Sequence, residues 1–192
     1  MITDEYKREM VKRHAASIKW GASAIKFGGH ELVGYIEKYK GAIQTILDFG
    51  SGKGVLEEWV NDRLQCPKPV WTKYDPGIPG IDKLPDGKFD MVMTCDVLEH
   101  VEPHLIDQTI VELERLTRLV MYNNIACAPC NGTFVTGPYI GENIHINVQS
   151  PEWWKAKFAD RGRLVLYEYK AVSRRARREY RDRCTMVHEM IS

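Results

Sequence analysis

A glycine-rich segment in the first third of the chain has residue types that could hold a nucleotide-like ligand. Residues 49–54 read Phe-Gly-Ser-Gly-Lys-Gly and lie between the apolar stretch 44–47, which ends at Asp48, and a helical pattern. A bare backbone at a helix N-terminus can approach a ligand closely. Asp75 follows the next apolar stretch, 70–74, where its carboxylate could accept hydrogen bonds from ribose hydroxyls. The segment therefore indicates a nucleotide-like ligand, although a tight strand-to-helix turn would use glycines too.

The spacing of these glycines argues against a dinucleotide. They stand at positions 50, 52 and 54. The dinucleotide-binding fingerprint has its third glycine one position later, where this chain has Val55. The spacing therefore disfavours NAD and FAD as ligands.

Two other groups of residues could do chemistry, and each has a simpler interpretation. Cys127 and Cys130 have C-x-x-C spacing, but no second pair follows to complete a zinc site. They also do not open a helix after a first strand, as redox pairs do, so their role stays open. Segment 174–183 contains six arginines that could contact phosphates, but such a run is more often a solvated loop or exposed face.

The hydrophobic pattern alternates strands with helices. Apolar residues at helical spacing predict helices within 5–40 (with a break at Gly28-Gly29), from 55, over about 103–116 and from 150. Short apolar runs predict strands at 44–47, 70–74, 89–95, from 119, at 164–172 and at 184–191, with a loop at 76–88. This alternation is typical of an α/β fold with a mostly parallel sheet.

Length and composition predict one cored domain. The chain has 192 residues, of which 44% are hydrophobic, and its net charge is +1. We expect residues 1–40 to form an N-terminal helical lid and residues 41–192 to form the sheet core. The charged N-terminus does not resemble a signal peptide, and no apolar run approaches the roughly 18 residues of a membrane span. With five cysteines, an odd number, we expect a cytoplasmic protein without a disulfide scaffold or a membrane partner.

Four motifs, in order along the chain, resemble those of class I S-adenosylmethionine-dependent methyltransferases. Residues 46–54 (Ile-Leu-Asp-Phe-Gly-Ser-Gly-Lys-Gly) are similar to the family's glycine loop, and Asp75 matches the acid after its second strand. Residues 84–92 and 96–101 (Asp-Val-Leu-Glu-His-Val) resemble the segments before and after its fourth strand. Within the superfamily the chain looks most like uncharacterised bacterial and phage methyltransferases, which share Tyr74-Asp75-Pro76 and a segment like 145–154.

The resemblance covers about residues 44–172 and implies a fold and a cofactor. The fold would be a Rossmann-like three-layer sandwich, mostly parallel with an antiparallel final strand, and the cofactor would be S-adenosyl-L-methionine. The family usually has a helix and a strand before Leu84-Pro85, whereas here only residues 76–83 remain, so one connection is shortened and Ile81 is the expected adenine contact. The matching positions imply these cofactor-binding residues: Asp48, Gly50, Ser51, Gly52, Gly54, Asp75, Ile81, Asp96 and Val97.

Two histidines are the candidates for the acceptor side. Methyl transfer from a sulfonium is an in-line displacement, so much of the acceleration comes from positioning. A base is needed only where the acceptor loses a proton. His145 lies where the class I fold presents groups to the substrate, and His100 ends the Asp-Val-Leu-Glu-His motif. We therefore expect His145 and His100 to be catalytic, although a single histidine at 145 could equally be a structural hydrogen-bonding residue.

A metal version of this site is the alternative. Some class I methyltransferases carry a related motif, with two acids and a histidine, and bind a divalent ion. The corresponding ligands here would be Asp96, Glu99, His100 and His145, a set suited to Mg²⁺ or Mn²⁺. Similar motifs also occur in metal-free members, where Glu99 and His100 orient the next helix. The metal-free version is the default.

The predicted function is S-adenosylmethionine-dependent methyl transfer to O or N of a small-molecule or nucleotide-like acceptor. One alternative is a non-catalytic cofactor-binding protein. A second is a nucleic-acid methyltransferase that uses the C-terminal arginine segment. No motif in the chain identifies the acceptor or an oligomeric state.

Overall fold

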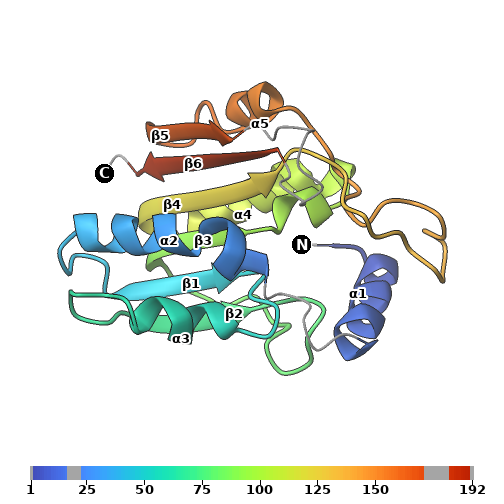
Figure 1. The fold of residues 1–192 in the computed structure, drawn as a ribbon, viewed down its shortest axis with the longest axis horizontal. Coiled ribbons are helices and arrows are strands. Elements are labelled where there is room, and N and C mark those ends of the chain that lie inside the picture. The colour runs from blue at the N-terminus through green and yellow to red at the C-terminus, as the bar shows by residue number, and fades with distance from the viewer. Residues whose placement is uncertain (1, 17–22, 171–181, 191–192) are drawn as a thin grey trace.

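A computed structural model describes residues 2–16, 23–170 and 182–190, and its centre is one six-stranded sheet. The strand order is β2-β1-β3-β4-β6-β5 (Figure 1). The strands are β1 Thr45–Phe49, β2 Val70–Tyr74, β3 Phe89–Cys95, β4 Thr117–Ala126, β5 Arg163–Lys170 and β6 Arg183–Glu189. β1 is parallel to β2 and β3, and β3 is parallel to β4, whereas β6 is antiparallel to both β4 and β5. The prediction of a mostly parallel sheet with an antiparallel final strand is confirmed.

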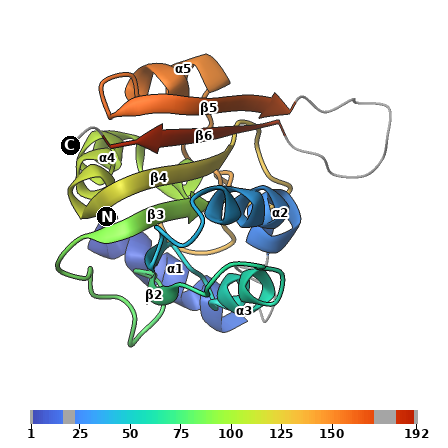
Figure 2. The same ribbon diagram turned by 90° about the vertical axis from the view of Figure 1, so that its left-hand side faces the viewer.

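Helices cover both faces of the sheet and give a three-layer sandwich. Figure 2 shows α2 and α3 on one face and α4 and α5 on the other. The α-helices are α1 Asp4–Ala16, α2 Ser23–Lys38, α3 Val55–Asn61, α4 Ile106–Leu116 and α5 Pro151–Lys157, and the 3₁₀ helices are η1 Leu98–His100 and η2 Pro103–Leu105. Among the described residues, every helix is too short or too polar to cross a membrane.

The alternation of side chains along the central strands builds the two cores. In β3, Met91 and Met93 pack with Leu32 of α2, while Val92 between them packs with Leu113 of α4. Successive residues of a strand point to opposite faces of the sheet. Because both faces of β3 are buried, the centre of the strand, residues 91–93, is an uninterrupted apolar run.

The predicted helix break at Gly28-Gly29 is wrong. α2 runs through both glycines, and the physical reason is close packing. A Cβ on Gly29 would lie 2.7 Å from the ring of Trp59 in α3, and one on Gly28 would lie 3.0 Å from Cys95 Sγ at the end of β3. The two glycines therefore let the helix approach α3 and the sheet instead of ending it.

The connection between β2 and β3 is short, as the sequence predicted. Residues 75–88 contain neither helix nor strand. The segment turns back on itself through hydrogen bonds from Ile78 N to Asp75 O (3.1 Å) and from Asp75 N to Ile81 O (2.9 Å).

α1 lies apart from the two helical layers, beside the edge where β1 and β3 end (Figure 1). Lys7 Nζ donates to Asp82 Oδ2 across 2.9 Å, which ties α1 to the shortened connection. Thr3 N donates to Glu102 Oε2 across 2.7 Å. Tyr6 and Met10 pack with Phe134 and Ile144 in a small separate core. α1 is therefore held across this edge by contacts with distant segments.

Candidate active site

A cavity of about 300 Å³ opens at the carboxyl edge of β1 and β3. In open α/β sheets this edge is where ligands bind. The structure brings nine of the sequence-predicted site residues together on its wall: Asp48, Gly50, Ser51, Gly52, Asp75, Asp96, Val97, His100 and His145. Gly54 and Ile81 are not on the wall.

Gly54 and Ile81 instead shape the segments around the cavity. Gly54 is the N-cap of α3 with φ +69°. A Cβ there would lie 2.7 Å from the flexible end of the Lys73 side chain, which could move, so glycine is needed here for the positive φ of the turn. The backbone O of Ile81 accepts the hydrogen bond from Asp75 N, and this contact fixes the start of the shortened connection.

The glycine loop is shaped by backbone conformations that favour glycine. Gly50 has φ +81° and Gly52 has φ +53°. A Cβ on Gly50 would lie 2.5 Å from Val97 Cγ2, so the loop and the segment after β3 are in direct contact. Gly50 N and Ser51 N both donate to Tyr74 O, at 2.7 and 3.0 Å. The loop after β1 is thus anchored to the end of β2.

Asp75 holds this loop with its carboxylate. Its Oδ2 accepts from Gly52 N and its Oδ1 accepts from Gly77 N, both at 2.8 Å. His14 Nε2 of α1 lies 3.5 Å from the same Oδ1. Burial lowers the pKa of His14, and the Asp75 charge opposes that shift. Asp75 therefore organises the glycine loop, in addition to lining the cavity.

Asp48 is a buried carboxyl group on the cavity wall. Burial, together with the nearby negative charge of Asp75, raises the pKa of Asp48 to about 7. Its Oδ2 has no hydrogen-bond partner among the described residues. A buried polar oxygen without a partner costs free energy, so Asp48 is suited to receive a donor or a positive charge from a ligand.

Asp96 forms a buried ion pair that the sequence did not predict. Asp96 has φ +63° directly after β3, and Arg183 Nη2 of β6 donates to its Oδ1. Arg183 Nη1 also donates to Asn124 Oδ1 across 2.7 Å. Because β6 is antiparallel, its first residue lies beside Ala126, the last residue of β4. Arg183, which closes the arginine run, is therefore part of the core, whereas residues 174–181 lie outside the described part of the chain.

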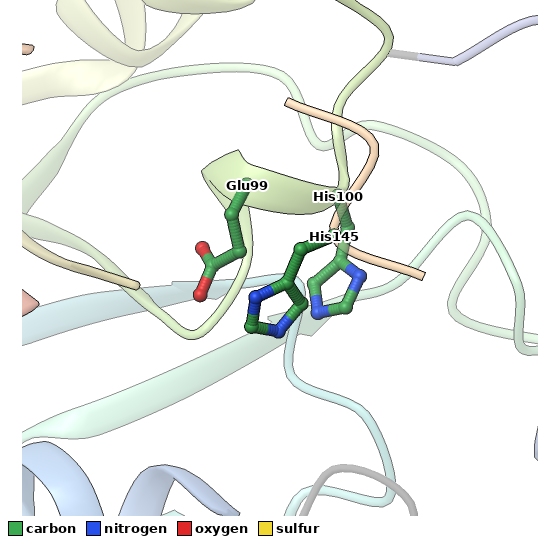
Figure 3. Close-up of side chains that lie close together, drawn as sticks. All are labelled: Glu99, His100 and His145. Carbon is green, nitrogen blue, oxygen red and sulfur yellow. The ribbon is translucent and has the colours of Figure 1, made fainter. Parts of the chain in front are cut away.

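The side chains of His100 and His145 are in contact with each other on the cavity wall. Their ring centroids are 4.8 Å apart and the rings are perpendicular (Figure 3). His100 Nδ1 lies 3.0 Å from Ile144 O, and His145 Nδ1 lies 2.8 Å from Ala128 O. Burial, followed by the neighbouring His145, lowers the pKa of His100 to about 4. His100 is therefore a neutral imidazole at neutral pH.

Glu99 lies beside the two histidines, fully buried. Its Oε1 accepts from Ala126 N at 2.9 Å, and its backbone O accepts from Asn147 N at 3.0 Å. Burial and the adjacent charge of Asp96 raise the pKa of Glu99 well above its ordinary value. Glu99 thus joins η1 to both β4 and the segment that carries His145.

The Cys127–Cys130 segment positions His145 through its backbone. Ala128 O accepts from His145, and the Asn143 side chain pairs with Cys130 N and O. Cys127 Sγ lies 3.6 Å from Cys184 Sγ, and all five cysteines are free thiols. The segment thus has a structural role, which the C-x-x-C spacing did not indicate.

Sequence reasoning missed the contribution of α1 to the cavity. Tyr6, Met10 and His14 line it from that helix. They stand at i, i+4 and i+8, the helical spacing of one face, which could have indicated a shared surface. Tyr6 OH is buried without a hydrogen-bond partner among the described residues. Only the fold shows that this face closes the ligand cavity.

Comparisons with known proteins assign the fold. No family model matches the sequence, and no curated protein is a significant relative. The 1,6-didemethyltoxoflavin N1-methyltransferase of Burkholderia thailandensis, solved with its acceptor and S-adenosylhomocysteine, is similar at TM-score 0.63 and 14% identity over 98% of this chain and 90% of that one. Magnesium protoporphyrin IX methyltransferase of Synechocystis PCC 6803, bound to S-adenosylmethionine, has TM-score 0.59 and 14% identity over 91% and 86%. DhpI bound to S-adenosylhomocysteine has TM-score 0.60 and 11% identity over 98% of both chains.

The chain therefore has the class I S-adenosylmethionine-dependent methyltransferase fold. The particular likeness to bacterial and phage methyltransferases stays a prediction.

Proposed function

We propose that this protein is an S-adenosylmethionine-dependent methyltransferase whose acceptor is a small molecule. The observation that carries the proposal is the convergence of the glycine loop, Asp75 and two imidazoles on one cavity. A volume of about 300 Å³ is at the lower end of small-molecule sites. The similar structures described above were solved with S-adenosylmethionine or its product.

The cofactor belongs in the half of the cavity built by β1 and β2. The glycine loop offers its backbone to the ligand there, and Asp75 offers carboxylate lone pairs to the ribose hydroxyls. The carboxyl group of Asp48 faces the same space and would favour the positively charged parts of the cofactor. Val97 contacts the loop from the β3 side.

The acceptor belongs in the other half, between η1, the segment around His145, and α1. Tyr6, Met10 and Ile144 give this half an apolar surface, and the two imidazoles add its polar groups. Among the described residues that line the cavity, none is a lysine or an arginine. An acceptor without phosphate groups fits this wall best. The Burkholderia thailandensis neighbour was solved with 1,6-didemethyltoxoflavin bound.

The cofactor assignment is tested by thermal unfolding with S-adenosylhomocysteine and with NAD. A ligand at about 100 times its dissociation constant stabilises the folded state by about 2.7 kcal/mol. We expect S-adenosylhomocysteine to raise the melting temperature and NAD to leave it unchanged. Equal shifts with both ligands, or a shift with NAD alone, would contradict the assignment.

Asp75→Ala refines this test, with Asp86→Ala as the matched control in the same loop. Each charge-assisted hydrogen bond is worth about 1.5–3 kcal/mol, so Asp75→Ala should weaken S-adenosylhomocysteine binding at least 10-fold. Some stability should also be lost, because Gly52 N and Gly77 N lose their acceptor. Asp86 is exposed, and its variant should bind like the wild type. Unchanged affinity in Asp75→Ala would remove Asp75 from the cofactor site.

Two rival functions make different predictions. A non-catalytic cofactor-binding protein would bind S-adenosylhomocysteine but would transfer no label from methyl-labelled cofactor to any compound in a metabolite extract. A nucleic-acid methyltransferase would label RNA or DNA, with binding that weakens steeply as salt rises. A labelled small molecule supports the proposal over both.

A further inference from the structure

Glu99, His100 and His145 form a compact group of metal-ligating side chains at the acceptor half of the cavity (Figure 3). One carboxylate oxygen and one nitrogen from each ring all lie within 4.8 Å of one another. Glu99 and His100 are consecutive residues of η1, and His145 comes from a segment more than forty residues later. His100 and His145 also line the cavity, so a ligand there could reach the group.

The hydrogen bonds of the two rings define which nitrogen could bind an ion. Each Nδ1 lies at hydrogen-bond distance from a backbone carbonyl, Ile144 O for His100 and Ala128 O for His145. A carbonyl oxygen only accepts, so each Nδ1 carries the proton and donates. The Nε2 atom of each ring then has the lone pair. Backbone carbonyls fix metal-binding histidines in this way in many proteins.

Glu99 supplies an oxygen that the protein itself does not satisfy. Its Oε1 accepts from Ala126 N. Its Oε2 is buried and has no hydrogen-bond partner among the described residues. A buried carboxylate oxygen in this state is costly unless a cation or donor reaches it.

Asp96 does not belong to the group, although its sequence position suggested it. Its carboxylate pairs with Arg183. The remaining donors are two nitrogens and one oxygen. Imidazole-rich sets suit transition metals, whereas Mg²⁺ and Ca²⁺ prefer sets made of oxygen.

We propose that Glu99, His100 and His145 bind one transition-metal ion of the Mn²⁺, Fe²⁺, Co²⁺ or Zn²⁺ type at the acceptor end of the cavity. The use of this ion in methyl transfer rests on the proposed function, but its binding does not. When bound, such an ion would lower the pKa of a coordinated acceptor hydroxyl. The protein's own part is to fix both rings through Ile144 O and Ala128 O and to leave the remaining positions open toward the cavity.

Cobalt spectroscopy on the chelator-treated protein tests the site without any activity. We expect about one equivalent of Co²⁺ to give visible absorption bands of a nitrogen and oxygen site, and Zn²⁺ to displace them while Mg²⁺ does not. His145→Ala should lower the Co²⁺ affinity by about 10-fold or more. The control His104→Ala, at an exposed histidine, should retain the wild-type Co²⁺ affinity.

Several results would overturn the proposal. These are no Co²⁺ binding, unchanged affinity in His145→Ala, equal competition by Mg²⁺, or a thiolate-to-cobalt absorption band that places the ion on cysteines. If His145→Ala fails to fold, His145→Gln gives the same comparison. S-adenosylhomocysteine binding is measured on the wild type and on each variant. If the wild type binds Co²⁺ but does not bind S-adenosylhomocysteine, that result contradicts the proposed function and leaves the metal site standing.

Discussion

The two halves of the cavity are built in different ways. The cofactor half consists of consecutive residues, 48–52, completed by Asp75 at the end of the neighbouring strand. The acceptor half collects α1, η1, the segment around His145 and, behind them, the first residue of β6. A contiguous motif carries the first half, whereas the second depends on contacts between segments that are far apart in sequence. The cofactor half should therefore tolerate changes in tertiary packing that would dismantle the acceptor half.

Arg183→Met is expected to have the largest effect on stability, because it breaks the packing behind the acceptor half. Arg183 is buried and paired with Asp96, whose side chain is 11% exposed, and removal of one partner of a buried pair costs about 3–5 kcal/mol. Arg163→Met is the matched control on the neighbouring strand, since Arg163 is exposed in its pair with Glu189 and should cost about 1 kcal/mol or less. Urea unfolding of both variants measures the difference. Equal losses would show that the buried pair does not hold β6 to the β3 end.

The sequence predicted where the glycine loop and Asp75 lie in the fold, because that information is local. Glycine spacing and the acid after the second strand can be recognised without knowing the fold, and seven of the nine predicted cofactor-binding residues line the cavity. Sequence reasoning failed where tertiary contacts determine the role of a residue. Gly28-Gly29 is a packing contact with Trp59 and Cys95, and Arg183 looked like the end of a charged run.

The N-terminal helices show another limit of sequence reasoning. Residues 1–40 were predicted as one helical lid, which stays a prediction. In the structure α1 lies across the cavity edge, whereas α2 packs on the sheet and contributes Ala24 to the cavity wall. Both segments have helical periodicity. What separates them is which distant surface each one covers, and periodicity does not encode that.

Asp48→Asn should remove a pH dependence that belongs to the cofactor half. The pKa of Asp48 rises from 3.8 to about 7 in the folded protein, so between these values the folded state binds more protons than the unfolded state. Folding stability contributed by this group therefore falls as pH rises from about 4 to about 7. The shift corresponds to at most about 4 kcal/mol, which Asp48→Asn should recover at pH 8.

Unfolding free energies of wild type and Asp48→Asn at pH 4 and pH 8 check this. Asp86→Asn, at an exposed carboxyl, should follow the wild type at both values. A constant difference between wild type and Asp48→Asn across pH would contradict the raised pKa.

Gly50→Ala and Gly80→Ala compare a glycine inside the cofactor half with one outside it. Both have positive φ, +81° and +96°, so alanine costs each about 1–2 kcal/mol in backbone strain. Only at Gly50 would the new Cβ meet a neighbour, Val97, which adds about 1–3 kcal/mol. Calorimetry should show weaker S-adenosylhomocysteine binding in Gly50→Ala alone. The same affinity loss in both variants would mean that general destabilisation, and not the loop contact, is responsible.

Tyr6→Phe should have the smallest effect on stability. It tests whether the Tyr6 hydroxyl in the acceptor half serves a ligand and not the fold. The Tyr6 hydroxyl is buried without a partner among the described residues, so its removal should leave the unfolding free energy within about 1 kcal/mol of wild type or raise it. S-adenosylhomocysteine affinity should not change. A loss well above 1 kcal/mol would show that the hydroxyl serves the fold instead of the cavity.

A crystal structure of the complex with S-adenosylhomocysteine tests the division of the cavity most directly. We expect the ribose hydroxyls on Asp75, the amino-acid part beside the glycine loop and Asp48, and the sulfur facing the half that holds His100 and His145. The methyl group that S-adenosylmethionine carries on this sulfur would then point at the acceptor space under α1. If the adenosine part of the ligand lies on the His145 side, or if the ligand binds outside the cavity, the assignment of the two halves is contradicted.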